Sequence, residues 1–453
     1  MRLVSILLLL PLAACSSKEE SEVEPDGGSD TDTDTDTDAD TDTDTDTGTE
    51  TGTGSDTFPE DYQVIDVATG RSHTCAVLDG GGIKCWGSNQ FGPLGYPVDE
   101  QVCGGSTPDT CPFVDLGEPA VQVEAGGYHT CALLESGAVK CWGYDLGPGS
   151  ICHGVLGPGI EVPPCGWVDD PSGTGVLSLQ GSIAAISATD CHTSALKSSG
   201  KVRTWGCAYQ PQLSQSEVTP DNRLIDFGGA AVQISTGEDH HCVLVEGGDV
   251  YCWGLNEQGQ LGYGHTDFVA AAQVPDQAGP VELGGPAVQV AAGGQHSCAL
   301  LENGEVVCWG QGAGGQLGYG NTENVGDDEL PMEAGTVEIG GAATRISAGT
   351  FNTCAVRGDG SLVCWGANSG VPLGYGTDEL IIGDDETPAS VGPLDVAGTV
   401  ADISVGYVHL CATMASGRIR CWGENESGQL GYGGDEDVGD DETPASAGDV
   451  PLM

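Results

Sequence analysis

Residues 295–310 read QHSCALLENGEVVCWG, and this pattern occurs seven times along the 453-residue chain, once in altered form. Two cysteines stand ten positions apart, a Trp-Gly pair follows the second cysteine, and a glycine lies six positions after the first. The tryptophans recur every 56 or 57 residues except around the third copy, at Trp86, Trp142, Trp205, Trp253, Trp309, Trp365 and Trp422. Such a period indicates a repeat architecture in which each copy is one structural unit.

Each copy is predicted to be a β-hairpin. The recurring glycine would occupy the third, left-handed position of a three-residue loop, which suits glycine because it has no Cβ atom. The predicted loops are 79–81, 135–137, 198–200, 246–248, 302–304, 358–360 and 415–417. Counting outward from each loop places the two cysteines of a regular copy opposite one another, at a non-hydrogen-bonded pair where a Cα separation of about 4.5 Å suits a disulfide.

This register predicts disulfides, with free buried thiols as the alternative. The regular copies predict Cys75–Cys85, Cys131–Cys141, Cys242–Cys252, Cys298–Cys308, Cys354–Cys364 and Cys411–Cys421. In the third copy Ser194 and Thr204 take the cysteine positions, and Cys191 with Cys207, each three residues farther from the loop, is the predicted pair. Within two insertions the simplest pairings are Cys103–Cys111 and Cys152–Cys165.

The N-terminus has the features of a secretory signal. Residues 1–14 give a basic start, an apolar run and small residues, and they are too few to span a bilayer as a helix. The ending LAAC at 12–15 resembles the lipobox of bacterial lipoproteins, which implies cleavage before Cys15, its lipidation and, with Ser16 next, export to the outer membrane of a Gram-negative bacterium. Removing Cys15 from the nineteen cysteines leaves an even number. An ordinary signal peptide with a chance cysteine is the alternative.

Residues 15–57 contain almost no apolar side chains and consist largely of alternating Asp and Thr. Such a segment has nothing to bury and many like charges, so it is predicted to be a disordered linker. Fully extended, it would reach on the order of 140 Å from a membrane. A low-affinity calcium sponge and an O-glycosylated stalk are the alternative interpretations.

Residues 58–453 are predicted to be all-β, because apolar residues alternate over short runs between glycine-rich turns. Four strands are expected in each unit: one like 280–283 (PVEL), one like 287–291 and the two arms of the hairpin. The chain ends on 449–452 (DVPL), which matches the PVEL strand that the first unit lacks. The two ends of the domain are therefore expected to complete one shared blade.

The stretches between the hairpins also repeat. NEQGQLGYG at 256–264 returns as GQLGYG at 315–320 and as NESGQLGYG at 425–433. Together with AAGGQHSCALLENGEVVCWG at 291–310, these stretches resemble the repeat of the regulator of chromosome condensation family. The resemblance covers nearly all of 61–453 and, with the lipobox, indicates a bacterial lipoprotein member of that family. The resemblance implies a seven-bladed β-propeller, from which the cysteine pairs and the insertions at 97–114 and 146–177 depart.

Few residues suggest chemistry. Six histidines stand two places before the first cysteine position, with asparagine in the remaining copy; they are His73, His129, His192, His240, His296, His409 and Asn352. A ring of metal ligands is rejected in favour of neutral imidazoles that bond a neighbouring backbone. No nucleophile elbow, HExxH or paired CxxC motif is present, and the GxGxxG at 310–315 lacks its βαβ context. No catalytic or cofactor-binding residue is therefore predicted.

Three loops share the pattern Gly-Asp-Asp-Glu after an apolar residue. Clustered carboxylates are what a hard cation such as Ca²⁺ prefers, although the EF-hand spacing is absent. The weak calcium candidates are Asp327, Asp328, Glu329, Asp384, Asp385, Glu386, Asp440, Asp441 and Glu442. Solvated acidic loops are the simpler interpretation.

Charge limits the partners. Residues 58–453 contain eleven Lys and Arg against 52 Asp and Glu, so a phosphate backbone would be repelled and nucleic acid is excluded. The predicted function is a monomeric, non-catalytic platform for an unknown protein partner, held by Cys15 at the membrane of the cell envelope, on its periplasmic side or at the cell surface. An envelope glycan hydrolase or lyase with carboxylates on a propeller face is the alternative. Guanine nucleotide exchange, which the family resemblance suggests, is less expected for an exported protein.

Overall fold

A computed structural model gives the structure of the chain. It describes residues 62–97, 103, 105–144, 156, 167–206, 224–225, 227–271, 278–368, 373–377 and 379–453. The predicted signal peptide, Cys15 and the linker lie outside these residues. The described residues all belong to the compact unit that spans 60–453.

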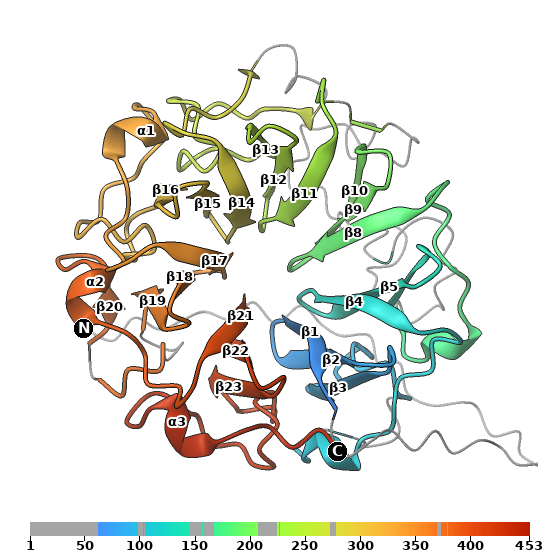
Figure 1. Ribbon diagram of the computed structural model, residues 1–453. Coiled ribbons are helices and arrows are strands. Elements are labelled where there is room, and N and C mark those ends of the chain that lie inside the picture. The colour runs from blue at the N-terminus through green and yellow to red at the C-terminus, as the bar shows by residue number, and fades with distance from the viewer. Residues whose placement is uncertain are drawn as a thin grey trace, which may run out of the picture. The chain divides into compact units, whose positions relative to one another are not determined.

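Seven antiparallel sheets form a ring of blades around a central channel (Figure 1). The inner strands are β1 (Val64–Thr69), β4 (Ala120–Ala125), β8 (Ile183–Ala188), β11 (Ala231–Thr236), β14 (Ala287–Ala292), β17 (Ala343–Ala348) and β21 (Val400–Val405). The middle strands are β2 (His73–Leu78), β5 (His129–Leu134), β9 (His192–Lys197), β12 (His240–Val245), β15 (His296–Leu301), β18 (Asn352–Arg357) and β22 (His409–Met414). The outer strands are β3 (Ile83–Gly87), β6 (Val139–Tyr144), β10 (Val202–Gly206), β13 (Val250–Gly254), β16 (Val306–Gly310), β19 (Leu362–Ala367) and β23 (Ile419–Gly423). The predicted seven-bladed propeller is confirmed.

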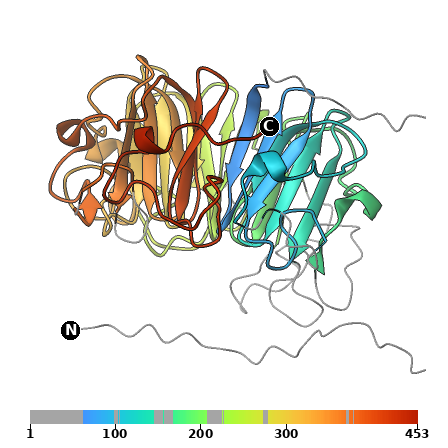
Figure 2. The same ribbon diagram turned by 90° about the horizontal axis from the view of Figure 1, so that it is seen from below.

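The remaining elements are short. Two blades carry a fourth strand, β7 (Trp167–Val168) beside β6 and β20 (Ile381–Ile382) beside β19. Three four-residue helices, α1 (Pro331–Ala334), α2 (Pro388–Val391) and α3 (Pro444–Ala447), lie in loops, with 3-10 turns at Pro108–Thr110 and Pro171–Gly173. No helix of the described residues has the length and apolar character needed to cross a bilayer. Figure 2 shows the strands from the side, running between the two faces of the ring.

The hairpins form as predicted. All seven loop glycines have a positive φ, between +74° and +94°, which only glycine adopts without strain. The paired cysteines of the six regular hairpins face one another with Cα atoms 4.0–4.1 Å apart and are disulfide-bonded. Cys103 and Cys111 are also bonded. Cys207, the predicted partner of Cys191, lies outside the described residues, as do Cys152 and Cys165.

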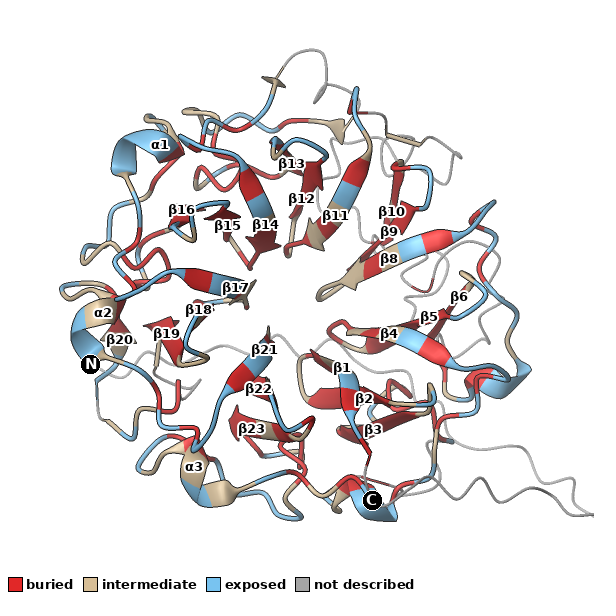
Figure 3. Ribbon diagram, in the orientation of Figure 1, coloured by how far each residue is buried: buried red, intermediate tan, exposed pale blue. Residues whose placement is uncertain are grey.

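The core lies between blades. The middle strands are buried along nearly their whole length, whereas the inner strands alternate between buried and exposed residues (Figure 3). Five of the repeat tryptophans are fully buried and the other two, Trp205 and Trp253, nearly so. Because each blade packs on two neighbours, the tryptophan and the cysteine that precedes it are both buried on opposite faces of one strand.

The expected PVEL strand is wrong. Residues 280–283 form no strand, and the main-chain N of Val281 donates a single hydrogen bond of 2.8 Å to the carbonyl of Val250, on the outer edge of the preceding blade. The reason is visible two residues farther along that edge. There the hydroxyl of Tyr263 contacts both the N and the O of Cys252, at 3.1 and 2.9 Å, and occupies the place of a longer fourth strand. The tyrosine of the GYG motif thus protects an edge strand.

Ring closure also differs from the expected shared blade. The C-terminal segment pairs with the last blade, through a 2.9 Å bond from Val450 N to Ile419 O, so it completes no blade with β1. The first blade (β1–β3) instead joins the last (β21–β23) in the same way as every other pair of neighbouring blades. The main-chain N of Val64, the first residue of the inner strand, donates to the carbonyl of Gly417, the hairpin glycine of the last blade, at 2.9 Å. Leu452 is fully buried beside this seam, where its N donates to the Tyr62 hydroxyl at 3.3 Å.

Candidate functional site

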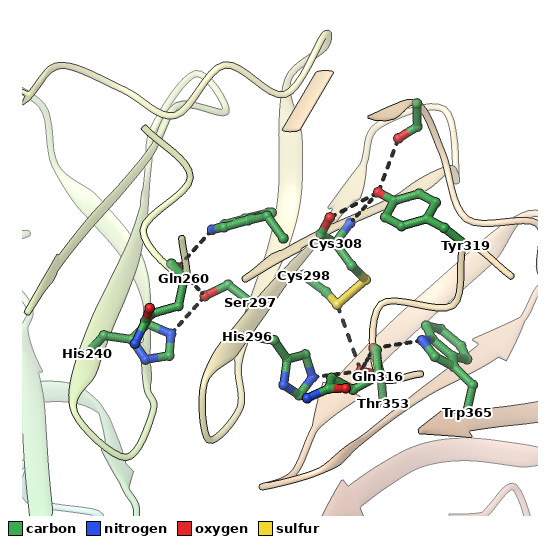
Figure 4. Close-up of a disulfide and its surroundings, with 12 residues drawn as sticks. His240, Gln260, His296, Ser297, Cys298, Cys308, Gln316, Tyr319, Thr353 and Trp365 are labelled. Carbon is green, nitrogen blue, oxygen red and sulfur yellow. Dashed lines mark hydrogen bonds between the residues drawn. A yellow bond between two sulfur atoms is a disulfide. The ribbon is translucent and has the colours of Figure 1, made fainter. Parts of the chain in front are cut away.

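The histidine ring is a set of contacts between blades. His240 Nε2 lies 2.8 Å from Ser297 Oγ of the next blade, and the Ser297 hydroxyl donates to the main-chain carbonyl of Gln260 at 3.0 Å (Figure 4). The equivalent pairs are His73 with Thr130, His129 with Thr193, His296 with Thr353 and His409 with Thr74, at 2.7–3.0 Å. In these five pairs the ring nitrogen Nε2 meets a hydroxyl, where the sequence predicted a backbone group.

The network fixes the tautomer. Because the Ser297 hydroxyl proton is committed to Gln260, its oxygen accepts, and His240 must carry its proton on Nε2. Burial lowers the pKa of His240 to about 3 and that of His296 to about 4, so both are neutral. At the junction of blades 6 and 7 both members change, since Asn352 stands for the histidine and Leu410 for the hydroxyl. The ring is therefore structural.

The channel is lined by a ladder of side chains that link neighbouring inner strands. Gln122 accepts from Ile186 N at 3.0 Å and donates to Ile186 O at 2.8 Å. Gln233 and Gln289 make the same two bonds to Val290 and Ile346. Nearer the far end of the strands, Ser187, Ser235, Ser347 and Ser404 accept from the main-chain N of the following inner strand, at 2.9–3.3 Å.

Two carboxyl groups replace members of this ladder. Asp66 takes a glutamine position and accepts from Val123 N at 2.8 Å, while Glu124 takes a serine position and accepts from Gln122 Nε2 at 2.9 Å. Burial first, and then the charge of Asp402, raises the pKa of Asp66 to about 7. Burial and the neighbouring Asp66 raise the pKa of Glu124 to about 8. Both carboxyl groups accept hydrogen bonds within the propeller, and this structural role accounts for their positions.

One end of the channel opens between seven loops, which we call the mouth loops. They join each inner strand to its middle strand and comprise 70–72, 126–128, 189–191, 237–239, 293–295, 349–351 and 406–408. Main-chain bonds link neighbouring loops, as from Gly127 N to Asp190 O at 3.0 Å and from Tyr407 N to Gly70 O at 3.4 Å. The hairpin loops lie at the other end of the middle strands, on the opposite face. The channel encloses about 380 Å³.

Arginine and aromatic rings gather at this mouth. The Arg71 guanidinium lies 4.7 Å from the centroid of the Tyr407 ring and 5.6 Å from that of Tyr128. Phe351 packs edge-on against Tyr407 with centroids 6.0 Å apart, and 40% of its surface is exposed. Phe91 extends the cluster, 5.5 Å from Tyr128. Exposed aromatic rings with an arginine are the side chains most enriched where proteins bind proteins.

Carboxylates border the cluster. Asp190 lies 3.9 Å from the Arg71 guanidinium. Burial, then the charges of Asp190 and Asp239, raises the pKa of Glu238 to about 7. The pKa of Asp239 is raised as well, by burial and by Asp190 and Glu257, against the opposing effect of His192. The mouth is thus an aromatic surface with excess negative charge.

A family model with the description "RCC1-like domain" matches residues 34–381 and, in a second overlapping match, 146–451. The chain belongs to the RCC1-like family. Among curated relatives, the ultraviolet-B receptor UVR8 of Arabidopsis thaliana is 28% identical over 380 residues, which cover 82% of this chain and 79% of that protein. The human E3 ubiquitin-protein ligase HERC2 is 29% identical over 355 residues, 77% of this chain but 7% of HERC2.

Solved structures agree on the RCC1-like fold. A chain from the crystal structure of Kap60 bound to yeast RCC1 (Prp20) superimposes with a TM-score of 0.61 at 20% identity, covering 84% of both chains. Human WBSCR16 also gives 0.61, at 22% identity, covering 78% of this chain and 92% of that one. At these identities the likeness shows the fold alone.

The acidic triplets of this RCC1-like propeller lie at its periphery. Each follows a residue that pairs with an outer strand: Val325 with Gly310, Ile382 with Gly366 and Val438 with Gly423. Within each triplet the three carboxylates offer oxygens within 4.8 Å of one another, a donor set of the kind that calcium prefers. Burial, a hydrogen bond to Asp441 and the charge of Asp440 raise the pKa of Glu442 to about 7. The three triplets belong to separate blades and form no joint site.

Sequence reasoning missed the mouth of the RCC1-like propeller. The repeats hold one signal that could have found it, because the residue two places before the histidine position changes chemistry from copy to copy, whereas a glycine precedes it in six of the seven copies. At that position stand Arg71, Gly127, Asp190, Glu238, Gly294, Thr350 and Tyr407. Positions at which the residue varies between copies are those where one face of a repeat protein can acquire its own chemistry.

Proposed function

We propose that this RCC1-like propeller is a protein-binding platform of a bacterial cell envelope that engages its partner through the mouth of the central channel. The observation that carries the proposal is the cluster of Arg71, Tyr407 and Phe351, in which an arginine and an exposed ring are held against a second ring by the packing of the mouth loops. Pre-positioned aromatic and arginine side chains bind well because little side-chain entropy remains to be lost.

The N-terminus supports the location. The lipobox-like LAAC at 12–15 would attach Cys15 to a membrane, and the acidic linker would hold the propeller away from it. Disulfides in six hairpins agree with an oxidising compartment outside the cytoplasm. Labelling cells with radioactive palmitate tests the anchor. The full chain should incorporate the label and Cys15→Ser should not.

Cross-linking on intact cells tests the platform. A tagged full-length chain should give a discrete cross-linked partner, identified by mass spectrometry, and Phe351→Ala should reduce its yield at least tenfold. Val288→Ala is the matched control, because Val288 is also an exposed apolar residue, at 52%, but sits on an inner strand away from the mouth loops. Equal yields from the two variants would contradict the proposal.

The glycan-cleaving alternative is tested in parallel with the same preparation. The proposal expects no turnover of peptidoglycan or polysaccharide by the purified chain. Turnover that disappears on replacing Asp66 or Glu124 by the corresponding amide would establish catalysis in the channel and replace the binding function as the conclusion.

A further inference from the structure

The mouth carries negative charge that the chain itself compensates only in part. The structure describes all seven mouth loops, and Arg71 is the one Lys or Arg among them, against Asp190, Glu238 and Asp239 on two adjacent loops. Arg71 approaches Asp190 no closer than 3.9 Å. The negative charges of Asp190 and Asp239 raise the pKa of Glu238. The positive charge of Arg71 lowers this pKa, but it is the smallest of the causes that shift it. A cation from outside would relieve this repulsion.

The mouth leads into a channel with room for a side chain. Asp190, Glu238, Thr350 and Tyr407 line the same cavity of about 380 Å³ as Glu124 deeper inside. Glu124 occupies the same position in its repeat as Ser235, which lies three residues before Glu238. The carboxylates of Glu124 and Glu238 therefore lie at two levels of the channel, about 10 Å apart along the strand direction.

Small residues line the wall at the level of Glu238 and below it. They include Gly127, Gly294, Ala188, Ala292 and Ala125. An aliphatic stem can lie against such a wall while a charged end reaches a carboxylate at either level.

The aromatic faces decide which cation fits. Arg71 already lies over one face of the Tyr407 and Tyr128 rings, so an incoming guanidinium would have to compete with it there. A lysine ammonium is a compact charge on a flexible stem and needs carboxylates more than a flat surface. Exposed Phe351, beside Tyr407, is left to contact the chain that carries the lysine.

We propose that the mouth binds a lysine-bearing segment of a partner protein, with one lysine side chain entering the channel between Asp190 and Glu238. The inference rests on the proposed function and adds the chemistry of the partner. The negative charge of residues 58–453, with eleven basic against 52 acidic residues, attracts such a segment from a distance.

Titration calorimetry of the full-length protein at pH 8 tests the inference. The probe is a blocked peptide with three consecutive lysines, and the reference peptide has norleucine in their place. The lysine peptide should bind at one site per chain and the norleucine peptide should not. Glu238→Gln and Asp190→Asn should each weaken binding about tenfold. Glu246→Gln should leave it unchanged, since Glu246 is an exposed glutamate of the same blade, in the hairpin loop on the opposite face. A cooperative melting transition at or above the wild-type temperature will show that the variants are folded.

Several outcomes would overturn the inference. Equal weakening by Glu238→Gln and Glu246→Gln would mean that bulk charge alone attracts the peptide. Binding of the norleucine peptide would mean apolar docking, and equally tight binding of free butylammonium would mean a small-amine site. If cross-linking on cells is lost with Phe351→Ala but kept with Glu238→Gln, the platform stands and the lysine inference fails. If the wild type cross-links to no protein on cells, the proposed function fails. The peptide titration then shows by itself whether the mouth binds lysine.

Discussion

The indole nitrogen of Trp309 donates a hydrogen bond of 2.9 Å to the main-chain carbonyl of Gln260, which belongs to the preceding blade. Ser297 donates to the same carbonyl at 3.0 Å. The next junction repeats the arrangement, with Trp365 and Thr353 both donating to Gln316 at 3.0 Å. The Cys-Trp-Gly and Gly-Gln-Leu-Gly motifs therefore recur in phase because one motif of each blade bonds the other motif of its neighbour.

Trp309→Phe tests this junction. The substitution removes the donor and leaves a small void in a fully buried site, so it should lower the free energy of unfolding by about 2–3 kcal/mol. Guanidinium denaturation followed by circular dichroism measures the change. Val288→Ala, at an exposed position, should cost less than about 0.5 kcal/mol. Equal effects would show that the indole contact does not stabilise the junction.

Each hairpin disulfide should stabilise the fold locally. Replacing Cys298 and Cys308 together by alanine should cost about 2.5 kcal/mol in the entropic account of a short closed loop, measured by the same denaturation. Peptide mapping without reduction should recover the seven disulfides of the described residues and also the predicted Cys191–Cys207 and Cys152–Cys165. Recovery of Cys191 joined to Cys165 or Cys152 would refute the register argument for the third copy.

Stability should depend on pH in two opposite ways. The buried histidines have lowered pKa values, about 3 for His73, His129 and His409, so the unfolded chain takes up protons first as the pH falls below 6.5. Their stabilisation is complete above pH 6.5 and is lost toward pH 3. Asp66 and Glu124 have raised pKa values, about 7 and 8, so their contribution is complete below about pH 4 and is lost as the pH rises to 8.

The melting temperature should therefore be highest near pH 6.5 and fall on both sides, because below pH 6.5 the loss from the several buried histidines exceeds the gain from the two carboxyls. Asp66→Gln separates the two effects. A glutamine there can copy Gln122, which bonds both the N and the O of its neighbouring strand, and it cannot ionise. The variant should melt higher than the wild type at pH 8 and show a smaller alkaline decline, with the acid decline unchanged. A pH profile identical to the wild type would contradict the assignment.

The C-terminal segment should hold the seam between the first and last blades. Deleting 449–453 removes the buried side chains of Val450 and Leu452, so about 3–5 kcal/mol should be lost and the whole propeller should melt at a lower temperature. Calorimetry measures this. A melting curve unchanged by the deletion would show that the Val64–Gly417 bond and the strand contacts close the ring unaided.

Features set within one repeat could be predicted from the sequence. The loop glycine and the spacing of Cys298 and Cys308 determine the hairpin and its register, and both involve contacts between residues close in the chain. The partner of His240 was misjudged because Ser297 is brought to it by blade packing, 57 residues away. The PVEL segment resembles a strand in composition, yet only Val281 bonds the neighbouring edge, because Tyr263 occupies the rest.

The candidate site was beyond sequence reasoning for the same reason. Arg71, Tyr407 and Glu238 lie far apart in the chain, in loops that look like ordinary glycine-rich turns. Only ring closure, which sets the first blade beside the last, brings Arg71 onto Tyr407. The acidic triplets stood out in the sequence because each is contiguous, but they remain three separate groups at the periphery.

Binding of a protein at the mouth of the channel can be measured as an affinity. The partner cross-linked to the wild-type chain is purified and its affinity measured against the wild type, Phe351→Ala and Val288→Ala. We expect Phe351→Ala to raise the dissociation constant at least tenfold and Val288→Ala to leave it unchanged. Equal affinity of all three proteins for the partner would contradict this expectation.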